Sequence, residues 1–405
     1  MAGLNQAANL PPQIQGYYDK RALITAENVL VHAELATQKT LPEGEGSTVT
    51  FWRYAPLTTQ TSDLTETTDL GIPVSSRQQL VEQEVACTPT LKGDFISIGR
   101  LASLRSIDQG VAEKLDRVVQ QGMESIDQIL STYFGTNLMR RRADGDTNFQ
   151  ADGTTTSAGS TTSIVDSGRN AADAAKPGIA DGYYIGGYIT FTSGPAYGMT
   201  SQITAYTNAS GTFTVNAFPV APGSGATYRV VVGTGIGNTS VINSRALRGV
   251  NLDLFNQKAM RFDKGFFKCA LNPNMHFDFF DDPVFVKASE HKESMDGLET
   301  NEVGVFAGVQ FLKSTLLYRE TVAGAASTSG AVHAVPIVGK DALGVVSLGA
   351  TPKGKKNINT YIRTWDQLGQ PIPIYDTIGW QAAIGEVALN GCFGVTLLCG
   401  SSDQI

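Results

Sequence analysis

One segment of the chain comes close to a phosphate-binding loop. Residues 349–356, GATPKGKK, place two glycines and a lysine at the spacing of a P-loop. The last position is Lys356, where a P-loop has the serine or threonine that ligates magnesium. The residues that follow, 357–365, predict a strand, whereas a P-loop leads into a helix. We therefore interpret this segment as a basic loop and expect no nucleotide cofactor.

A second cluster joins one histidine to three carboxylates. His276, Asp278, Asp281 and Asp282 lie within seven residues of each other. Close carboxylates suit calcium or magnesium, but this segment lacks the glycine and the terminal glutamate of a calcium loop. We interpret it as a solvated turn or a polar contact between subunits, and we expect no bound metal.

No arrangement of residues predicts catalysis. The four histidines form no HExxH-like pair, and the serine in residues 344–349, GVVSLG, is not at the position of a nucleophile elbow. We find no nucleophile–base pair and expect no enzymatic activity. The chain has four cysteines, which are Cys87, Cys269, Cys392 and Cys399. They form no CxxC pair, so we expect buried, reduced thiols rather than a disulfide or a zinc site.

Composition limits the remaining functions. The chain has 405 residues and a net charge of −7, which argues against a basic nucleic-acid binder, so any contact with DNA should be local and weak. Charged residues make up only 17% of the chain, which suggests that neighbours cover large surfaces. The amino terminus has no signal-peptide pattern, and no apolar run reaches membrane-spanning length.

The first 92 residues predict arms rather than a closed domain. Residues 17–40 carry apolar side chains at helical spacing and predict an amphipathic helix. Residues 47–54 and 79–88 alternate as strands and predict a long β-hairpin with an acidic distal part. Exposed strand edges need a partner, and the expected partner is another copy of the chain.

Two groups of residues in and near this arm are candidates for contacts between subunits. Phe51, Trp52 and Tyr54 lie on a strand without an obvious core of its own, so we expect them to be buried against a neighbour. The other group is a charge pair between the acidic arm and a basic triplet: Glu66 and Asp69 with Arg140, Arg141 and Arg142. The triplet can also be a cation cluster that complements a helix terminus, or a contact to DNA phosphates.

A long helix and an uncharged segment follow. Residues 106–138 keep helical spacing over roughly 50 Å. Residues 147–176 are rich in small polar residues and predict a flexible or loop-rich connection. Residues 182–228 contain no charged residue and nine aromatic ones, which predicts a small inserted all-β module. Its aromatic rings are expected to form its core, with a carbohydrate-binding face as the alternative.

The second half of the chain predicts one helix and then many strands. Residues 240–262 have helical spacing. Short apolar strands are expected at 265–271, 284–288, 304–315, 334–338, 343–348, 358–365 and 380–399. The fold class that follows is α+β.

Several segments resemble the major capsid proteins of tailed bacteriophages, most closely the N-four-like podovirus branch. They are residues 41–54 (LPEGEGSTVTFWRY), 90–96 (TLKGDFI), 270–273 (ALNP), 304–309 (GVFAGV) and 376–382 (DTIGWQA). Their order and spacing extend over most of the chain outside residues 146–235. The resemblance implies the Hong Kong 97-like capsid fold, with an arm, an extended loop, a spine helix, and peripheral and axial domains.

The resemblance also implies a domain division and a function. The arm would be residues 1–40, the extended loop 41–92, the spine helix and start of the peripheral domain 93–145, the inserted module 146–235, and the axial domain with the rest of the peripheral domain 236–405. The protein would assemble in the host cytoplasm into hexamers and pentamers of an icosahedral shell, a virion capsid that encloses double-stranded DNA. Scaffolding, portal and decoration proteins are the further partners implied, and no membrane or cofactor is.

Two other functions stay open at this point. A shell of the same fold with a protein cargo, the encapsulin type, would need no large insertion, and neighbouring genes for a terminase and portal or for a cargo enzyme would distinguish the two. A glycan-binding adhesin built on residues 182–228 is the second, and glycan binding by that module would favour it.

Overall fold

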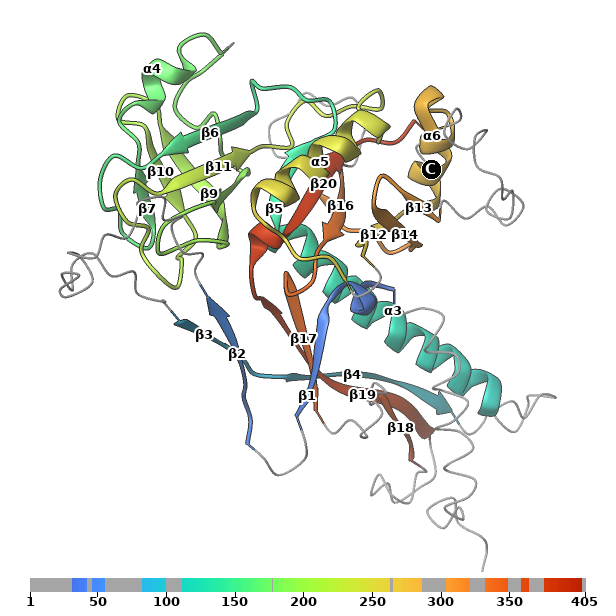
Figure 1. The fold of residues 1–405 in the computed structure, drawn as a ribbon. Coiled ribbons are helices and arrows are strands. Elements are labelled where there is room, and N and C mark those ends of the chain that lie inside the picture. The colour runs from blue at the N-terminus through green and yellow to red at the C-terminus, as the bar shows by residue number, and fades with distance from the viewer. Residues whose placement is uncertain are drawn as a thin grey trace, which may run out of the picture.

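The computed structural model of the chain describes residues 31–41, 46–54, 82–99, 111–176, 178–262, 265–285, 304–320, 332–348, 358–363 and 375–402. These residues form an α+β structure with three larger sheets, a two-stranded hairpin and a long helix, as Figure 1 shows. The α+β class predicted from the sequence is confirmed. None of the helices in this part of the chain is long and apolar enough to cross a membrane.

The first sheet is built around one long strand. The strand order is β1–β17–β19–β18, and β4 pairs along the other edge of β19, opposite β18. Pairing is antiparallel except between β1 and β17. The strands are β1 (Thr37–Leu41), β4 (Thr90–Gly99), β17 (Leu343–Leu348), β18 (Ile358–Arg363) and β19 (Tyr375–Ala388).

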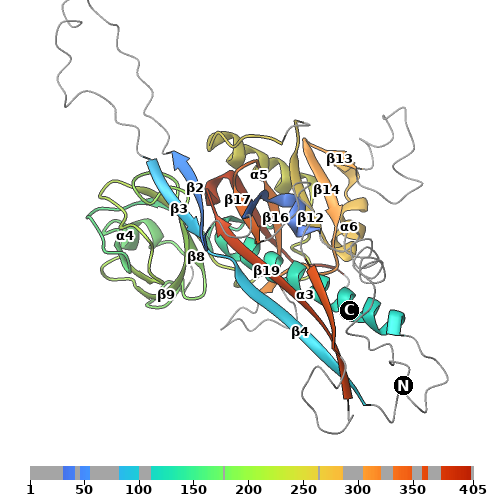
Figure 2. The ribbon, with the colours of Figure 1, turned by 90° about the horizontal axis from the view of Figure 1, so that it is seen from below.

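The hairpin lies next to this sheet. Its strands are β2 (Val49–Tyr54) and β3 (Glu82–Cys87), which pair antiparallel as predicted. Figure 2 shows β3 continuing into β4, so the hairpin extends from the same strand that borders β19. The chain between the two strands lies outside the described residues.

The second sheet has a different set of connections. Its order is β13–β14–β12–β16–β20–β5, with β15 paired to β16. The strands are β5 (Met139–Arg142), β12 (Phe267–Leu271), β13 (Val305–Phe306), β14 (Val309–Lys313), β15 (Arg319–Glu320), β16 (Val332–Val338) and β20 (Gly394–Cys399). Two helices, α5 (Ser244–Asn256) and α6 (Pro273–Phe280), pack near it, and a short 3-10 helix η4 (Gly391–Phe393) precedes β20.

The helix α3 (Val111–Asn137) joins these two sheets into one core. Its buried side chains recur every three or four residues: Val119, Met123, Ile126, Leu130 and Phe134. Toward its middle it packs on Trp380 of β19, and toward its end on β16 and β20. The prediction of a long amphipathic helix is confirmed for the residues that the structure describes.

Residues 150–231 form the third sheet, which has its own core. Its order is β6–β11–β8–β9–β10–β7. The strands are β6 (Gln150–Thr154), β7 (Ser163–Val165), β8 (Tyr188–Phe191), β9 (Thr200–Thr207), β10 (Thr212–Val215) and β11 (Thr227–Val231), with the short helix α4 (Arg169–Asp173). Its ends lie side by side, because the Val232 amide donates to the Phe149 carbonyl at 2.9 Å. Adjacent ends are typical of an inserted module.

Three local predictions are wrong, and two elements were not predicted. Residues 284 and 285, where the strand 284–288 was expected to begin, are helical. Residues 147–176 are not a loose connection, because β6, β7 and α4 belong to the inserted module. The predicted helix 17–40 does not reach its expected end: η2 (His32–Leu35) is followed by strand β1, while residues 17–30 lie outside the described part. The strand β4 and the helix α6 were not predicted at all.

Gly122 of α3 is required by a close approach rather than by a turn. A Cβ atom there would lie 2.7 Å from the Trp380 ring, whose Nε1 donates to the Gln121 side chain at 3.1 Å. The indole is 5% exposed and has little room to move. A glycine that normally weakens a helix is here the contact point between helix and sheet.

We expect Gly122→Ala to lower the free energy of unfolding. Alanine gains about 1 kcal/mol of helix propensity, but overpacking against a buried ring costs about 1–3 kcal/mol. Ser125→Ala, on the same helix and without a close neighbour of this kind, is the matched control and should be neutral or stabilising. Chemical denaturation of both variants measures the difference; a Gly122→Ala variant more stable than the control variant would show that the ring moves freely.

Candidate assembly surfaces

The outer face of β4, β19 and β18 carries exposed apolar side chains. Successive residues of a strand point to opposite faces, so Leu91 and Phe95 share one face of β4. They are 66% and 67% exposed, and Tyr361 on β18 is 43% exposed. Phe95 and Tyr361 both lie opposite Gly379 of β19, one on each side of it.

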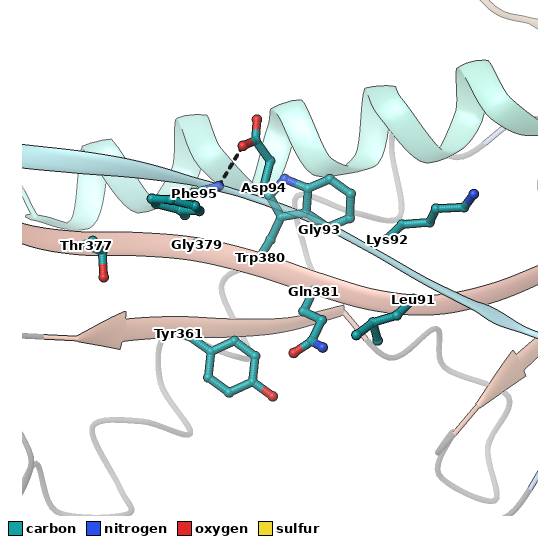
Figure 3. A pocket seen from close by; sticks show the side chains of 10 residues that line it. All are labelled: Leu91, Lys92, Gly93, Asp94, Phe95, Tyr361, Thr377, Gly379, Trp380 and Gln381. Atoms are coloured by element: carbon teal, nitrogen blue, oxygen red, sulfur yellow. Dashed lines mark hydrogen bonds between the residues drawn. The ribbon is translucent and has the colours of Figure 1, made fainter. Parts of the chain in front are cut away.

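Gly379 creates a groove between these two rings. A Cβ atom on Gly379 would lie 2.9 Å from the Phe95 Cβ, so any larger residue would push the ring away. The groove has a volume of about 680 Å³. Figure 3 shows Tyr361, Gln381 and Leu91 turned away from α3, whereas Asp94 and Trp380 turn toward that helix. One face of this sheet is therefore covered by α3, and the other presents an open apolar groove.

Phe51 and Trp52 of the hairpin point in opposite directions. Phe51 is 3% exposed and packs with Leu41, Cys87, Val346, Val387 and Leu389 of its own chain. The expectation that Phe51 is buried against a neighbour is therefore wrong, because strand alternation turns it onto the first sheet. Trp52 is 57% exposed and stays a candidate contact. The side chain of Tyr54 lies outside what the structure describes.

Arg140, Arg141 and Arg142 do not end a helix. They form β5, which pairs in parallel with β20. Arg140 and Arg142 are each 1% exposed. The reading of this triplet as a helix terminus is wrong, because α3 ends at Asn137 and the chain turns directly into the sheet.

The guanidinium groups of Arg140 and Arg142 fasten the inserted module to the rest of the chain. Arg140 lies 2.7 Å from Glu320 and 3.5 Å above the Tyr188 ring of the module. Arg142 donates to the carbonyls of Val232 and Thr234, at 2.6 and 2.7 Å, where the chain leaves the module.

Asp253 of α5 completes this junction. Its Oδ2 atom lies 2.7 Å from Nη1 of Arg141 and 2.8 Å from Nη1 of Arg229 on β11. One carboxylate therefore joins α5, β5 and the module. Since Glu66 and Asp69 lie outside the described residues, a contact between them and the triplet stays a prediction. To make it, Arg140 and Arg142 would have to leave buried partners, which is costly.

The cluster around His276 is a helix rather than a solvated turn. His276 and Asp278 are each 6% exposed on α6, and Asp278 accepts hydrogen bonds from Ser402. Asp282 accepts from the amide and hydroxyl of Ser244, where it caps α5. No group of side chains able to hold a metal ion occurs among the described residues. These carboxylates instead fix α6, α5 and the chain's end to each other.

A buried pair that the sequence did not reveal holds the first described residues. His32 donates its backbone amide to Asp127 of α3 at 2.9 Å, and its Nδ1 lies 2.8 Å from the other carboxylate oxygen. Both side chains are fully buried. A histidine and an aspartate 95 residues apart carry no sequence pattern that would have indicated this contact.

All four cysteines are free and buried, as predicted. Burial raises the pKa of Cys87 to about 11 and that of Cys392 to about 12. The thiols are therefore protonated at neutral pH and unreactive. Most aromatic rings of the inserted module are buried, and Tyr184, Phe191, Phe213 and Tyr228 belong to its core, as expected.

The fold is similar to those of solved capsid structures, although comparisons of the sequence with family models and curated proteins give no match. Neither a protein-family model nor a curated protein matches the chain. The capsid structure of Cyanophage P-SCSP1u is similar with a TM-score of 0.50 and 10% identity, over 93% of this chain and 89% of that one. The capsid of Ralstonia phage GP4 has a TM-score of 0.51 and 11% identity, over 92% and 88%.

The chain therefore has the Hong Kong 97-like fold of tailed-phage capsids, as the resemblance in its sequence implied. Each match covers about nine-tenths of both chains, so the similarity concerns the fold as a whole and not a single domain. The narrower assignment to the N-four-like branch stays a prediction.

We expect Phe51 and Trp52 to respond differently to alanine. Phe51→Ala removes a buried ring and should lower the free energy of unfolding by about 3–5 kcal/mol. Trp52→Ala removes an exposed ring and should leave the thermal transition of the isolated chain close to that of the wild type, while weakening association between copies. The two neighbouring variants control for each other in thermal unfolding and in light scattering. Equal losses of stability would show that Trp52 belongs to the core.

Acidification should destabilise the subunit through two buried histidines. Burial, together with nearby cations, lowers the pKa of His276 and of His333 to about 4, from the ordinary 6.5. Between pH 6.5 and 4 the unfolded chain binds protons that the folded one does not, so the free energy of unfolding should fall across this window and be unaffected above it.

The test is a series of denaturation curves between about pH 8 and pH 4. The ionic strength is kept constant so that the screening of charges does not vary. His276→Asn and His333→Asn cannot take up the proton and should each flatten the pH dependence. A wild-type curve with no slope in this window, or a slope unchanged in both variants, would contradict the assignment.

Proposed function

We propose that this chain is the major capsid protein of a tailed bacteriophage. In this role it assembles into hexamers and pentamers of an icosahedral shell that encloses double-stranded DNA. The observation that carries the proposal is the shared fold over about nine-tenths of the chain with two phage capsid structures. A structural role, rather than an enzymatic one, also agrees with the buried, protonated cysteines and the internally paired carboxylates.

The exposed apolar surfaces support this function. Leu91, Phe95 and Trp52 are large side chains that are more than half exposed in the single chain. Exposed apolar patches of this kind mark contact sites, and permanent interfaces commonly bury roughly 2,000–5,000 Å². In a closed shell many such contacts add together, so weak pairwise association is enough to hold the assembly.

The domains follow from the same proposal. We assign α3 as the spine helix and the sheet around β19 as the peripheral domain. The sheet of β12, β16 and β20 with α5 and α6 is the axial domain, and the third sheet is the inserted module. The hairpin β2–β3 is the base of the extended loop. In this assignment the arm is 1–40, the extended loop 41–92, and the spine helix with the start of the peripheral domain 93–145. The inserted module is 146–235, and the axial domain with the rest of the peripheral domain is 236–405.

The remaining partners and the location are part of the proposal. Assembly takes place in the host cytoplasm, with scaffolding, portal and decoration proteins as partners, and the finished protein resides in the virion capsid. Contact with packaged DNA is weak and not specific, in keeping with the net charge of −7. A shell with a protein cargo is the alternative, and neighbouring terminase and portal genes would argue against it.

Electron microscopy of the purified chain tests the proposal. We expect closed, regular shells or capsomers, formed alone or with the scaffolding protein of the same gene cluster. Phe95→Asp places a charge in the apolar groove and should reduce assembly, whereas Val220→Asp changes an exposed apolar residue on the inserted module and serves as control. A chain that stays monomeric under all these conditions, although folded, would contradict the proposal.

A further inference from the structure

The outer surface of α5 combines exposed apolar and basic side chains. Its inner side, including Leu247, Val250 and Leu254, is buried in the core. Leu252 and Phe255 point outward and are 58% and 55% exposed. Met260, just after the helix, is 57% exposed. Three large apolar side chains at one end of one helix exceed the scattered exposure expected on an ordinary surface.

The charges around these apolar residues are all positive. Arg248, Lys258 and Arg261 are exposed, and none forms an ion pair with any residue that the structure describes. The Arg261 guanidinium lies 5.0 Å from the centre of the Phe255 ring, which keeps its charge over the apolar patch. The one acidic residue of α5, Asp253, is already paired with two other arginines. We call these six residues the basic face: Arg248, Leu252, Phe255, Lys258, Met260 and Arg261.

The end of α6 has the opposite character. Phe277 is 57% exposed and Val284 43%, and the exposed Asp281 lies between them in sequence. The neighbouring carboxylates are occupied, since Asp278 bonds to Ser402 and Asp282 to Ser244. Asp281 forms no ion pair with any other residue that the structure describes. We call Phe277, Asp281 and Val284 the acidic face.

The two faces lie at opposite ends of α5. The acidic face adjoins its first residue, because Asp282 bonds to Ser244. The basic face starts several residues later and is centred on Leu252, roughly 12 Å further along the helix axis. Figure 1 shows α6 next to one end of α5, while the other end lies on the side of the inserted module. The two faces are therefore centred at different ends of α5.

We propose that the basic face of one subunit binds the acidic face of a second copy of the same chain, head to tail. Both faces carry large apolar side chains for the contact, and their charges are complementary, which sets orientation and disfavours pairing of like faces. A contact between two different surfaces of identical chains generates a ring when the rotation closes. This inference rests on the proposed function, because rings of five and six copies are the capsomers of such a shell.

Cysteine cross-linking distinguishes this contact from the alternatives. The native thiols are all buried, so an introduced surface cysteine is the reactive one in the folded chain. Leu252→Cys and Val284→Cys each place one thiol on one face. We expect assembled mixtures of the two variants to form a covalent dimer on mild oxidation, whereas each variant alone stays monomeric. The matched control replaces Val284→Cys with Val220→Cys, an exposed position on the inserted module, and should give no dimer.

The outcomes separate this inference from the proposed function. Thermal unfolding of each variant first establishes that it is folded. Shells that form normally while the mixture gives no more dimer than the control would overturn the head-to-tail contact and leave the capsid function standing. A dimer of Leu252→Cys alone would show that basic faces meet each other, or a different partner orientation, and would overturn it as well. If neither variant nor wild type assembles at all, both proposals fail.

Discussion

The long helix α3 is the element on which the rest of this structure depends. A single apolar stripe along it covers two sheets that share no strand, so their cores merge into one. Burial of that stripe, at roughly 25 cal/mol per Å² of apolar surface, is the main force that holds the sheets in one subunit. Polar contacts then fix the position of the first sheet along the helix, since the Tyr133 hydroxyl accepts from the Ala388 amide and the Gln121 side chain accepts from Trp380, both on β19.

The same helix anchors the beginning of the described chain. Asp127 lies on its buried side and holds His32 through two contacts, with Ser314 as a third donor at 3.4 Å. A buried carboxylate is tolerated only when its oxygens are hydrogen-bonded, so this site permits few arrangements of its neighbours. The chain leaving it enters β1, which pairs with β17. The arm is thus fixed at its root by the subunit's own core.

Buried arginines hold the inserted module against the rest of the subunit, whereas apolar packing on α3 holds the two sheets together. A module with its own core could rotate about its two connections, and interfaces between such parts are usually small. Here Arg140 contacts both Tyr188 of the module and Glu320 of β15, and Arg142 of β5 holds the segment where the chain leaves the module. Arg229 of the module pairs with Asp253 of α5. Breaking a buried charge pair by removing one partner costs several kcal/mol, so these contacts define one orientation.

What the sequence could predict was set by how local each pattern is. The helix spacing of α3, the alternation in β2 and β3, and the short strands within the uncharged residues 182–228 are patterns within single segments, and each predicted an element that the structure contains. The arginine triplet was misread because three adjacent cations say nothing about their partners, which lie from 2 to 180 residues away. The candidate surfaces were missed for a related reason. Leu91 and Phe95 look like ordinary core residues until the register with Gly379 shows which face of β4 is covered.

Strand alternation explains why neighbouring residues in this chain lie on opposite faces of a sheet. Phe51 and Trp52 are adjacent, as are Gly379 and Trp380, and in each pair one residue faces the subunit's core while the next faces outward. A shift of one residue in register would exchange them, exposing Trp380 and filling the groove at Gly379. Because α3 requires Trp380 on its side, through Gly122 and Gln121, it also determines that Phe95 and Tyr361 stand on the other side. The packing that stabilises the single chain thus also places the apolar residues that remain for its neighbours.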